Sequence, residues 1–183
     1  MNVLLDILGA TIVGGIVFTL FLNLNMYSSQ ARYSSNTELQ LMQNAKTLAE
    51  MLTYDLRKIG YNHKGESLIT TQNRRISFYA DIDTNGVDDV VGYALSSASE
   101  VPQTSNPNDK ILLRVVNGDT AKGPSLGITD LRFNYLNAKQ QPTAVLDSIK
   151  YIKAEIWVQS PEPVNEKYIC HLPVQEIGPI FLL

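Results

Sequence analysis

The feature that most constrains this chain of 183 residues is an apolar run near its start. From Val3 to Leu24 only Asp6 can carry a charge. About 20 apolar residues, each adding 1.5 Å to an α-helix, cross a hydrocarbon core of roughly 30 Å. A secretory signal would place basic residues before a shorter apolar core, and a core helix of a soluble domain would be amphipathic. We therefore expect residues 1–27 to form a membrane-spanning helix.

The residues that follow keep a helical period. Between Ser28 and Ile59 there is no proline or glycine. Apolar residues recur every three or four positions, which is typical of an amphipathic helix; they are Met42, Ala45, Ala49, Leu52, Leu56 and Ile59. Gly60 suits a left-handed helix cap. The pattern predicts one helix from Val3 to Ile59, in which residues 28–60 lay one face on a folded domain. Two helices joined by a hinge near residues 23–29 are the alternative.

Residues 61–183 change to the alternating period of β-strands. The expected strands are residues 75–80, 87–95, 110–116, 128–136, 149–159 and 167–172. In the clearest of them, residues 149–159, apolar residues alternate with polar residues and with a single tryptophan, Trp157. No helical stripe interrupts the strands, so antiparallel pairing is favoured over parallel βαβ units. The predicted fold class is α+β, with a long N-terminal helix packed on an antiparallel sheet.

Composition and motifs exclude several function classes. A net charge of −3 with interspersed signs argues against a nucleic-acid partner. Cys170 is the only cysteine, so there is neither an intramolecular disulfide nor a zinc-type ligand set. His63 lies in a polar loop, and His171 neighbours Cys170 on a strand where adjacent side chains point to opposite faces. Without a nucleophile motif or a phosphate-binding loop, we expect no catalytic residues, no enzymatic activity and no organic cofactor.

The segment from Asp81 to Asp89 allows two interpretations. Asp81, Asp83 and Asn85, followed by Gly86, match the first half of an EF-hand calcium loop, and Asp89 could supply the ninth position. The twelfth position is a glycine and not the bidentate glutamate of such loops, and the flanks are strands. Asp, Asn and Gly are also the residues that a tight hairpin turn requires. A plain turn is therefore favoured, with a calcium site as the alternative.

These features together resemble the type IV pilin superfamily, and within it the minor pilins and type II secretion pseudopilins. The resemblance is carried by the acid early in an apolar helix, by the uninterrupted amphipathic extension and by the β domain. Three further stretches contribute: MLTYDLRKIGY at 51–61, ISFYADIDTNG at 76–86 and GITDLRFNY at 127–135. The basic leader that precedes such helices in the family is not seen before Asn2. The resemblance therefore implies a membrane helix more strongly than it implies leader cleavage and N-methylation.

The resemblance implies a structural subunit of a type IV pilus or type II secretion-like filament. Asp6, fifth when counted from Asn2, would pair with the terminal ammonium of a neighbouring subunit; the alternative is that it only lies at the headgroup level. The implied partners are the membrane and other pilin-like subunits in a hetero-oligomeric filament. The implied location is the bacterial inner membrane, crossed once, with the C-terminal domain periplasmic or extracellular. The alternative function is a solitary anchored domain that binds a ligand or partner outside the membrane.

Overall fold

The fold was analysed in a computed structural model, which describes residues 3–101, 104–124, 126–164 and 166–179. For residues 171–179 only the backbone is described. The chain divides into two compact units, residues 1–37 and residues 38–183, and each is described by itself. The boundary falls inside a single helix, α1, which runs from Val3 to Leu56.

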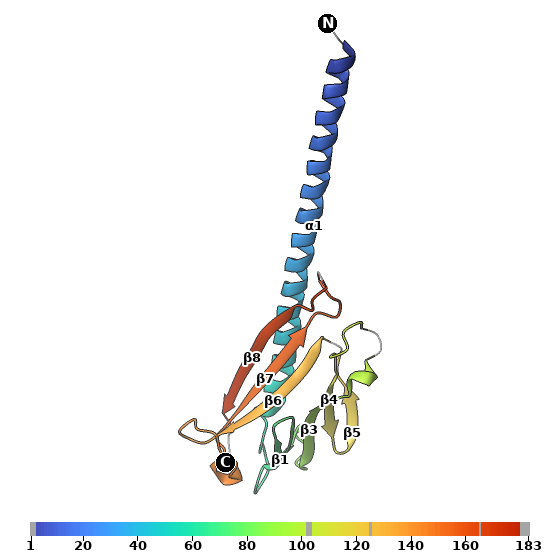
Figure 1. The fold of residues 1–183 in the computed structure, drawn as a ribbon. Helices are drawn as coiled ribbons and strands as arrows, with labels where there is room; N and C mark the ends of the chain where they lie inside the picture. Colours follow the sequence, from blue (N-terminus) through green and yellow to red (C-terminus); the bar gives the residue numbers. More distant parts are fainter. Residues whose placement is uncertain (1–2, 102–103, 125, 165, 180–183) are drawn as a thin grey trace. The chain divides into compact units, whose positions relative to one another are not determined.

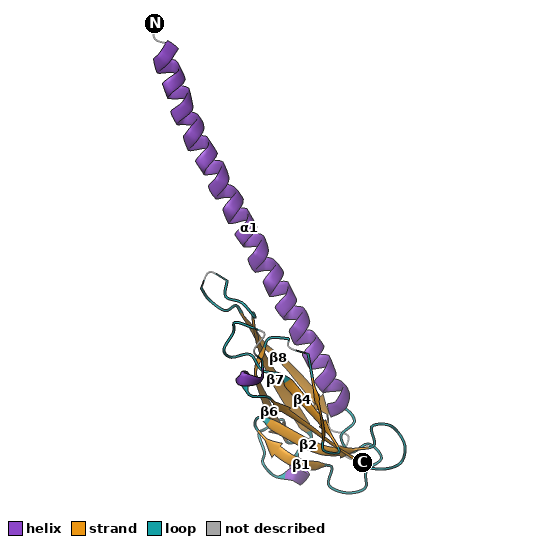
Figure 2. Cartoon of the chain, turned by 90° about the vertical axis from the view of Figure 1, so that its right-hand side faces the viewer, coloured by secondary structure: helices purple, strands orange, loops and turns teal. Residues whose placement is uncertain are grey.

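The second half of α1 packs against the β-sheets, as Figure 2 shows for the purple helix and the orange strands beside it. Five of the six residues predicted for the buried stripe are buried, and only Met42, which is 42% exposed, lies off the covered face. Leu48, which the predicted stripe omitted, is fully buried. The covered face is therefore the predicted one, with Leu41, which is 1% exposed, in place of Met42 and with Leu48 added.

The end of α1 also differs from the prediction. The helix stops at Leu56 and continues as turns, in which the Ile59 N–H donates to the Leu56 carbonyl at 3.3 Å. Gly60 has φ of +76°, which is the left-handed conformation expected of it. Its N–H donates to the Tyr79 carbonyl at 2.9 Å, so the chain leaves the helix already bonded to a strand.

The first sheet has five strands in sequence order, all antiparallel (Figure 1). They are β1 (Leu68–Gln72), β2 (Arg75–Ala80), β3 (Asp89–Leu95), β4 (Leu112–Val116) and β5 (Asp119–Lys122). Two of them, β1 and β5, were not predicted. The side chains of β5 are all exposed, so it has no alternating apolar pattern to detect. The region 117–127, predicted as a loop, therefore contains an edge strand.

The second sheet is formed by β6 (Ile128–Leu136), β7 (Tyr151–Gln159) and β8 (Cys170–Pro179), also antiparallel. The bounds of β6 agree with the prediction, whereas β8 begins three residues later than predicted and continues to Pro179. The alternation predicted for β7 is confirmed, because Ile152, Ala154, Ile156 and Val158 are buried. A backbone bond from the Phe133 N–H to the Asn73 carbonyl at 2.7 Å links the two sheets.

One apolar core joins α1 to both sheets. Its members include Leu41, Ala45, Leu48, Leu52 and Ile59 from the helix and its end, Ile76, Phe78, Val91, Tyr93 and Leu112 from the first sheet, and Leu131, Phe133, Ile152, Ala154, Ile156 and Val158 from the second. Burial of these side chains away from water is the main favourable contribution to folding. The predicted α+β class, a long N-terminal helix packed on antiparallel sheet, is confirmed.

Candidate functional site

Asp6 lies in the first turn of α1, within the unit of residues 1–37. The large apolar side chains from Val3 to Leu24 are between 46% and 83% exposed. The hydroxyls of Thr11 and Thr19 donate back to the carbonyls of Leu8 and Gly15, both at 2.9 Å. Such bonds leave few unpaired polar groups on the helix surface, which suits a hydrocarbon environment. By length and composition, this helix is able to cross a membrane.

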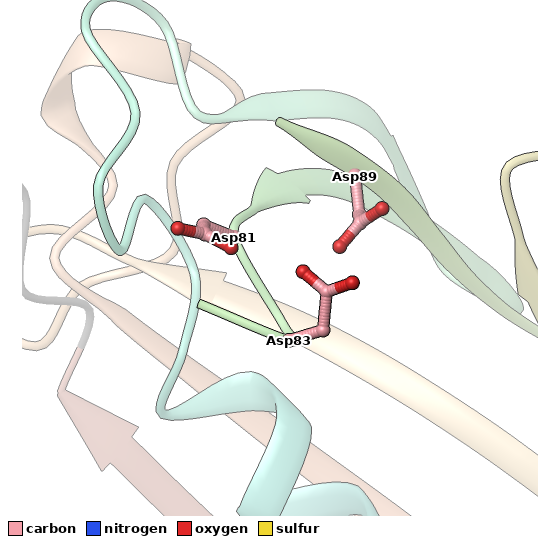
Figure 3. A group of neighbouring side chains, drawn as sticks. All are labelled: Asp81, Asp83 and Asp89. Atoms are coloured by element: carbon pink, nitrogen blue, oxygen red, sulfur yellow. The ribbon is translucent and has the colours of Figure 1, made fainter. Parts of the chain in front are cut away.

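Of the predicted calcium ligands, Asp81, Asp83 and Asn85 lie in the hairpin loop between β2 and β3, and Asp89 is the first residue of β3. One carboxylate oxygen from each of Asp81, Asp83 and Asp89 lies within 4.8 Å of the other two. Figure 3 shows the carboxylates of Asp83 and Asp89 facing one another, with Asp81 beside them. Asp81 is 1% exposed and Asp83 is exposed, so the group reaches from the protein interior to its surface. Three carboxylates this close could hold a metal ion.

The loop supplies hydrogen bonds to all three carboxylates. Asp81 accepts the backbone N–H groups of Asn85 and Gly86 at 3.1 and 3.0 Å. The side-chain amide of Asn62 donates to Asp81 at 3.0 Å, and this bond is the main cause that lowers the pKa of Asp81, against the opposing effect of burial. Asp89 accepts the Ile82 N–H at 3.1 Å. An ionised carboxylate has about four lone-pair sites, so these bonds nearly fill the acceptor capacity of Asp81. Asp89, which also accepts the Asn117 side-chain amide at 2.7 Å, and Asp83 keep capacity for a cation.

Asn85 is the predicted ligand that the structure directs elsewhere. Its Oδ1 accepts the Val87 N–H at 2.7 Å, and its Nδ2 donates to Asp83 at 2.8 Å. The amide therefore stabilises the turn and orients Asp83, while its oxygen is turned toward its own backbone. Both interpretations, the plain turn and the metal site, use the three aspartates. They differ at Asn85, which bonds within the turn and does not direct its side-chain oxygen toward the carboxylates.

Sequence reasoning missed a buried ionic group between α1 and the first sheet. Asp55 on the helix is 3% exposed. Its Oδ2 accepts the Tyr93 hydroxyl and the Arg114 Nε–H, each at 2.6 Å. Burial, followed by the bond to Asp55, raises the pKa of Tyr93, and the Asp55 bond raises the pKa of Arg114. In the sequence, Asp55 lies on the same helix face as the apolar residues Leu52 and Leu56. An acid at such a position was the signal from which a buried ionic group could have been predicted.

The histidine and cysteine positions form no catalytic pair in the described residues. His63 Nδ1 lies 2.9 Å from Asp88 Oδ2, and its ring stacks on Tyr79 with centroids 4.7 Å apart. Cys170 is exposed. The His171 side chain lies outside the described residues, so the predicted opposition of Cys170 and His171 stays a prediction.

A hollow of about 740 Å³ lies beside β6 and the loop 140–144. Its described lining is mainly apolar and amide side chains, with Lys153 and Tyr135 as the titratable groups. Lys153 pairs with Glu155 at 2.7 Å. Among the described lining residues there is no nucleophile beside a base, so the hollow resembles a groove and not a reaction centre.

Comparisons with known proteins give no neighbour from which to transfer a role. No family model, no curated protein and no solved structure matches the chain. The features of the chain that bear on its function are therefore α1, Asp6 and the carboxylate group of the β2–β3 loop.

Proposed function

We propose that the chain is a structural, non-enzymatic subunit of a pilin-like filament of the type IV pilus or type II secretion kind. The observation that carries the proposal is α1 itself. One helix, Val3–Leu56, begins with a surface of exposed apolar side chains around a single acid and ends with a face buried in a β-rich domain. In the proposed mechanism, the apolar part holds the subunit in the inner membrane before assembly and enters a bundle of like helices afterwards. The β domain then faces the periplasm or the exterior and meets partner subunits.

Asp6 is the feature that favours a filament subunit over a plain anchor. An acid within an apolar helix is costly in hydrocarbon, and such residues usually pair with another group. Pairing with the terminal ammonium of a neighbouring subunit would remove that cost and set the axial position of one helix relative to the next. A solitary anchored domain needs no such acid, and its binding partner would act on the β domain alone.

The test compares Asp6→Ala with Asp6→Glu, and uses Asp147→Ala as a control at an exposed aspartate of the β domain. The readout is the amount of the chain recovered in isolated filaments relative to the amount in the membrane. We expect Asp6→Ala to lower this ratio at least about tenfold, which corresponds to about 1.4 kcal/mol, and Asp6→Glu to retain most of it. Equal incorporation of all three variants would refute the role of Asp6. Absence of the unaltered chain from any filament would favour the anchored-domain alternative.

We further propose Ca²⁺ as the ion for the carboxylate group of the β2–β3 loop. Calcium takes six to eight oxygen ligands in flexible geometry, and the loop offers three convergent carboxylates of which two are partly solvent-accessible. Because a bidentate glutamate is missing, we expect weak affinity in the millimolar range that is typical of extracellular modules. Calorimetry with the full chain would show binding that Asp83→Asn removes and Asp147→Asn keeps. No heat of binding at several millimolar calcium would leave the loop as a plain turn.

A further inference from the structure

The loop of residues 104–109 is fastened to the turn that follows β7. The side-chain amide of Asn106 donates to the Ser160 carbonyl at 3.0 Å, and Ser105 Oγ donates to the Pro161 carbonyl at 3.0 Å. The Tyr168 hydroxyl donates to the Ser105 carbonyl at 2.7 Å. These bonds connect segments more than 50 residues apart, so the loop acts as a clasp on the β7–β8 connection. We call residues 104–109 the clasp.

Asp109, at the base of the clasp, is buried, and its carboxylate has no hydrogen-bond partner in the part of the chain that the structure describes. The residue is 1% exposed, and neither carboxylate oxygen has a partner among the described residues. The Thr104 Oγ1 beside it is also buried and lacks a bond of good geometry. An ionised carboxylate is acceptor-only and strongly hydrated in water, so a charged Asp109 would lose its hydration without receiving donors in exchange. A neutral carboxylic acid has no such charge to desolvate.

The surroundings of Asp109 hold no counter-charge in the described part of the chain. Burial raises the pKa of Asp109, against the opposing effect of the nearby Thr104 hydroxyl. The adjacent Lys110 directs its ammonium to the Thr129 carbonyl at 2.8 Å. The nearest fastening groups, Asn106 and Ser160, are neutral.

We propose that the clasp is a pH-sensitive device that closes fully when the Asp109 carboxyl is protonated and loosens when it ionises. The folded state binds this proton more tightly than the unfolded chain does. Its contribution to stability is therefore complete below the ordinary carboxyl range near pH 4 and is lost as the pH rises through the folded-state value. The proposal does not depend on the filament proposal, because both the clasp and its fastening lie in residues 38–183.

The test is urea unfolding of the full chain in detergent micelles between pH 4 and pH 8, followed by fluorescence of the single tryptophan, Trp157. Trp157 is two residues from Gln159, to which the Asn106 amide also donates at 3.2 Å. We expect the midpoint of the unaltered chain to fall as the pH rises. Asp109→Asn should show a weaker pH dependence and a higher midpoint than the unaltered chain at pH 8. Asp147→Asn, at an exposed aspartate, should follow the unaltered chain, and all three chains keep the His63–Asp88 pair.

Two results would overturn the proposal. One is parallel pH curves for the unaltered chain and Asp109→Asn. The other is a rise in the midpoint at pH 8 on adding millimolar Ca²⁺ that Asp109→Asn alone abolishes, because a cation would then occupy the place given to the proton. If Asp109→Asn does not fold, carbon-13 NMR of the aspartate carboxyls in the unaltered chain reads the Asp109 titration directly, and an ordinary titration near pH 4 would refute the device.

Discussion

Asp55, Tyr93 and Arg114 connect the helix to the first sheet through side chains alone. Asp55 comes from α1, Tyr93 from β3 and Arg114 from β4, and both donors meet the same carboxylate oxygen. A charge-assisted bond to a buried carboxylate is stronger than a neutral one, and it also has a direction. The group therefore restricts how the helix end can rotate on the sheet, which apolar contacts do less specifically.

Replacing Asp55 by Ala should destabilise the fold by about 3 kcal/mol, because it leaves Arg114 and the Tyr93 hydroxyl without their shared acceptor. The value is at the lower end for a buried pair, since the Arg114 side chain is 31% exposed and can partly rehydrate. Tyr93→Phe removes one of the two bonds and should cost about 1–3 kcal/mol. Urea unfolding is the measurement, and Glu50→Ala, at an exposed helix position, is the control. Equal midpoints for Asp55→Ala and Glu50→Ala would contradict the assignment.

The lowered pKa of Asp81 predicts that the fold loses stability in acid. The pKa of this carboxyl is lowered, chiefly by the Asn62 amide bond, so the folded state favours the ionised form. The stability that this provides is present above the ordinary carboxyl range near pH 4 and is lost as the pH falls through the lower folded-state value. Unfolding curves between pH 2 and pH 6 should show a shallower acid loss for Asp81→Asn than for Asp147→Asn. Identical acid limbs would mean that the loop bonds do not favour the charged carboxylate.

At the scale of elements, α1 shows how a helix prediction with the correct buried face can still misassign single residues at the edge of that face. The alternation of apolar and polar residues allows Leu41 or Met42 to begin the stripe, and packing on the sheet buries Leu41. The strands show a similar limit: β6 and β7 carry the alternation that burial of one face produces, whereas the fully exposed β5 carries none. Edge strands without a buried face are formed by backbone pairing to a neighbour, which composition does not reveal.

The helix face is tested by a matched pair of leucines. Leu48 is fully buried and Leu39 is 55% exposed, and both lie in the part of α1 within residues 38–56. Leu48→Ala should cost about 2–5 kcal/mol through lost burial and the cavity that remains, whereas Leu39→Ala should change stability by less than about 0.5 kcal/mol. The free energies of unfolding in urea give the comparison. Similar losses for both would show that the helix rests on the sheet by a different face.

At the scale of the whole molecule, the chain contains two units that meet different surroundings. Residues 38–183 have an apolar core, while the apolar side chains of residues 3–24 are exposed. Large exposed apolar surfaces in a folded chain mark a membrane or protein contact. The unit boundary falls after Thr37, beyond the residue 27 at which the apolar run was taken to end; Thr37 is 9% exposed, and the next buried helix residue is Leu41 in the second unit.

This division predicts how the chain partitions. The full chain should stay with membranes after an alkaline carbonate wash, and a chain that begins at Ser28 should be released to the soluble fraction. Ile16→Arg places a charge near the centre of the span, at a cost of roughly 2.5–3.5 kcal/mol, and should reduce retention, whereas Asp6→Leu should keep it. Immunoblots of both fractions give the result. A chain beginning at Ser28 that remains in the carbonate-washed pellet would contradict the assignment of residues 1–27 as the membrane segment.

The sequence by itself determined the helix, its apolar first part, the α+β class and the strands β6 and β7, because each depends on a local period that one face of burial imposes. It also identified Asp81, Asp83 and Asp89, since turn and ligand chemistry use the same close spacing. Only the tertiary structure decided that Leu41 and not Met42 faces the core, that there are two sheets, and that Asp55 meets Tyr93 and Arg114. It alone placed Asp109 in a buried position where the described residues supply its carboxylate with no donor. These are contacts between residues far apart in the chain, and no local period encodes which of them will meet.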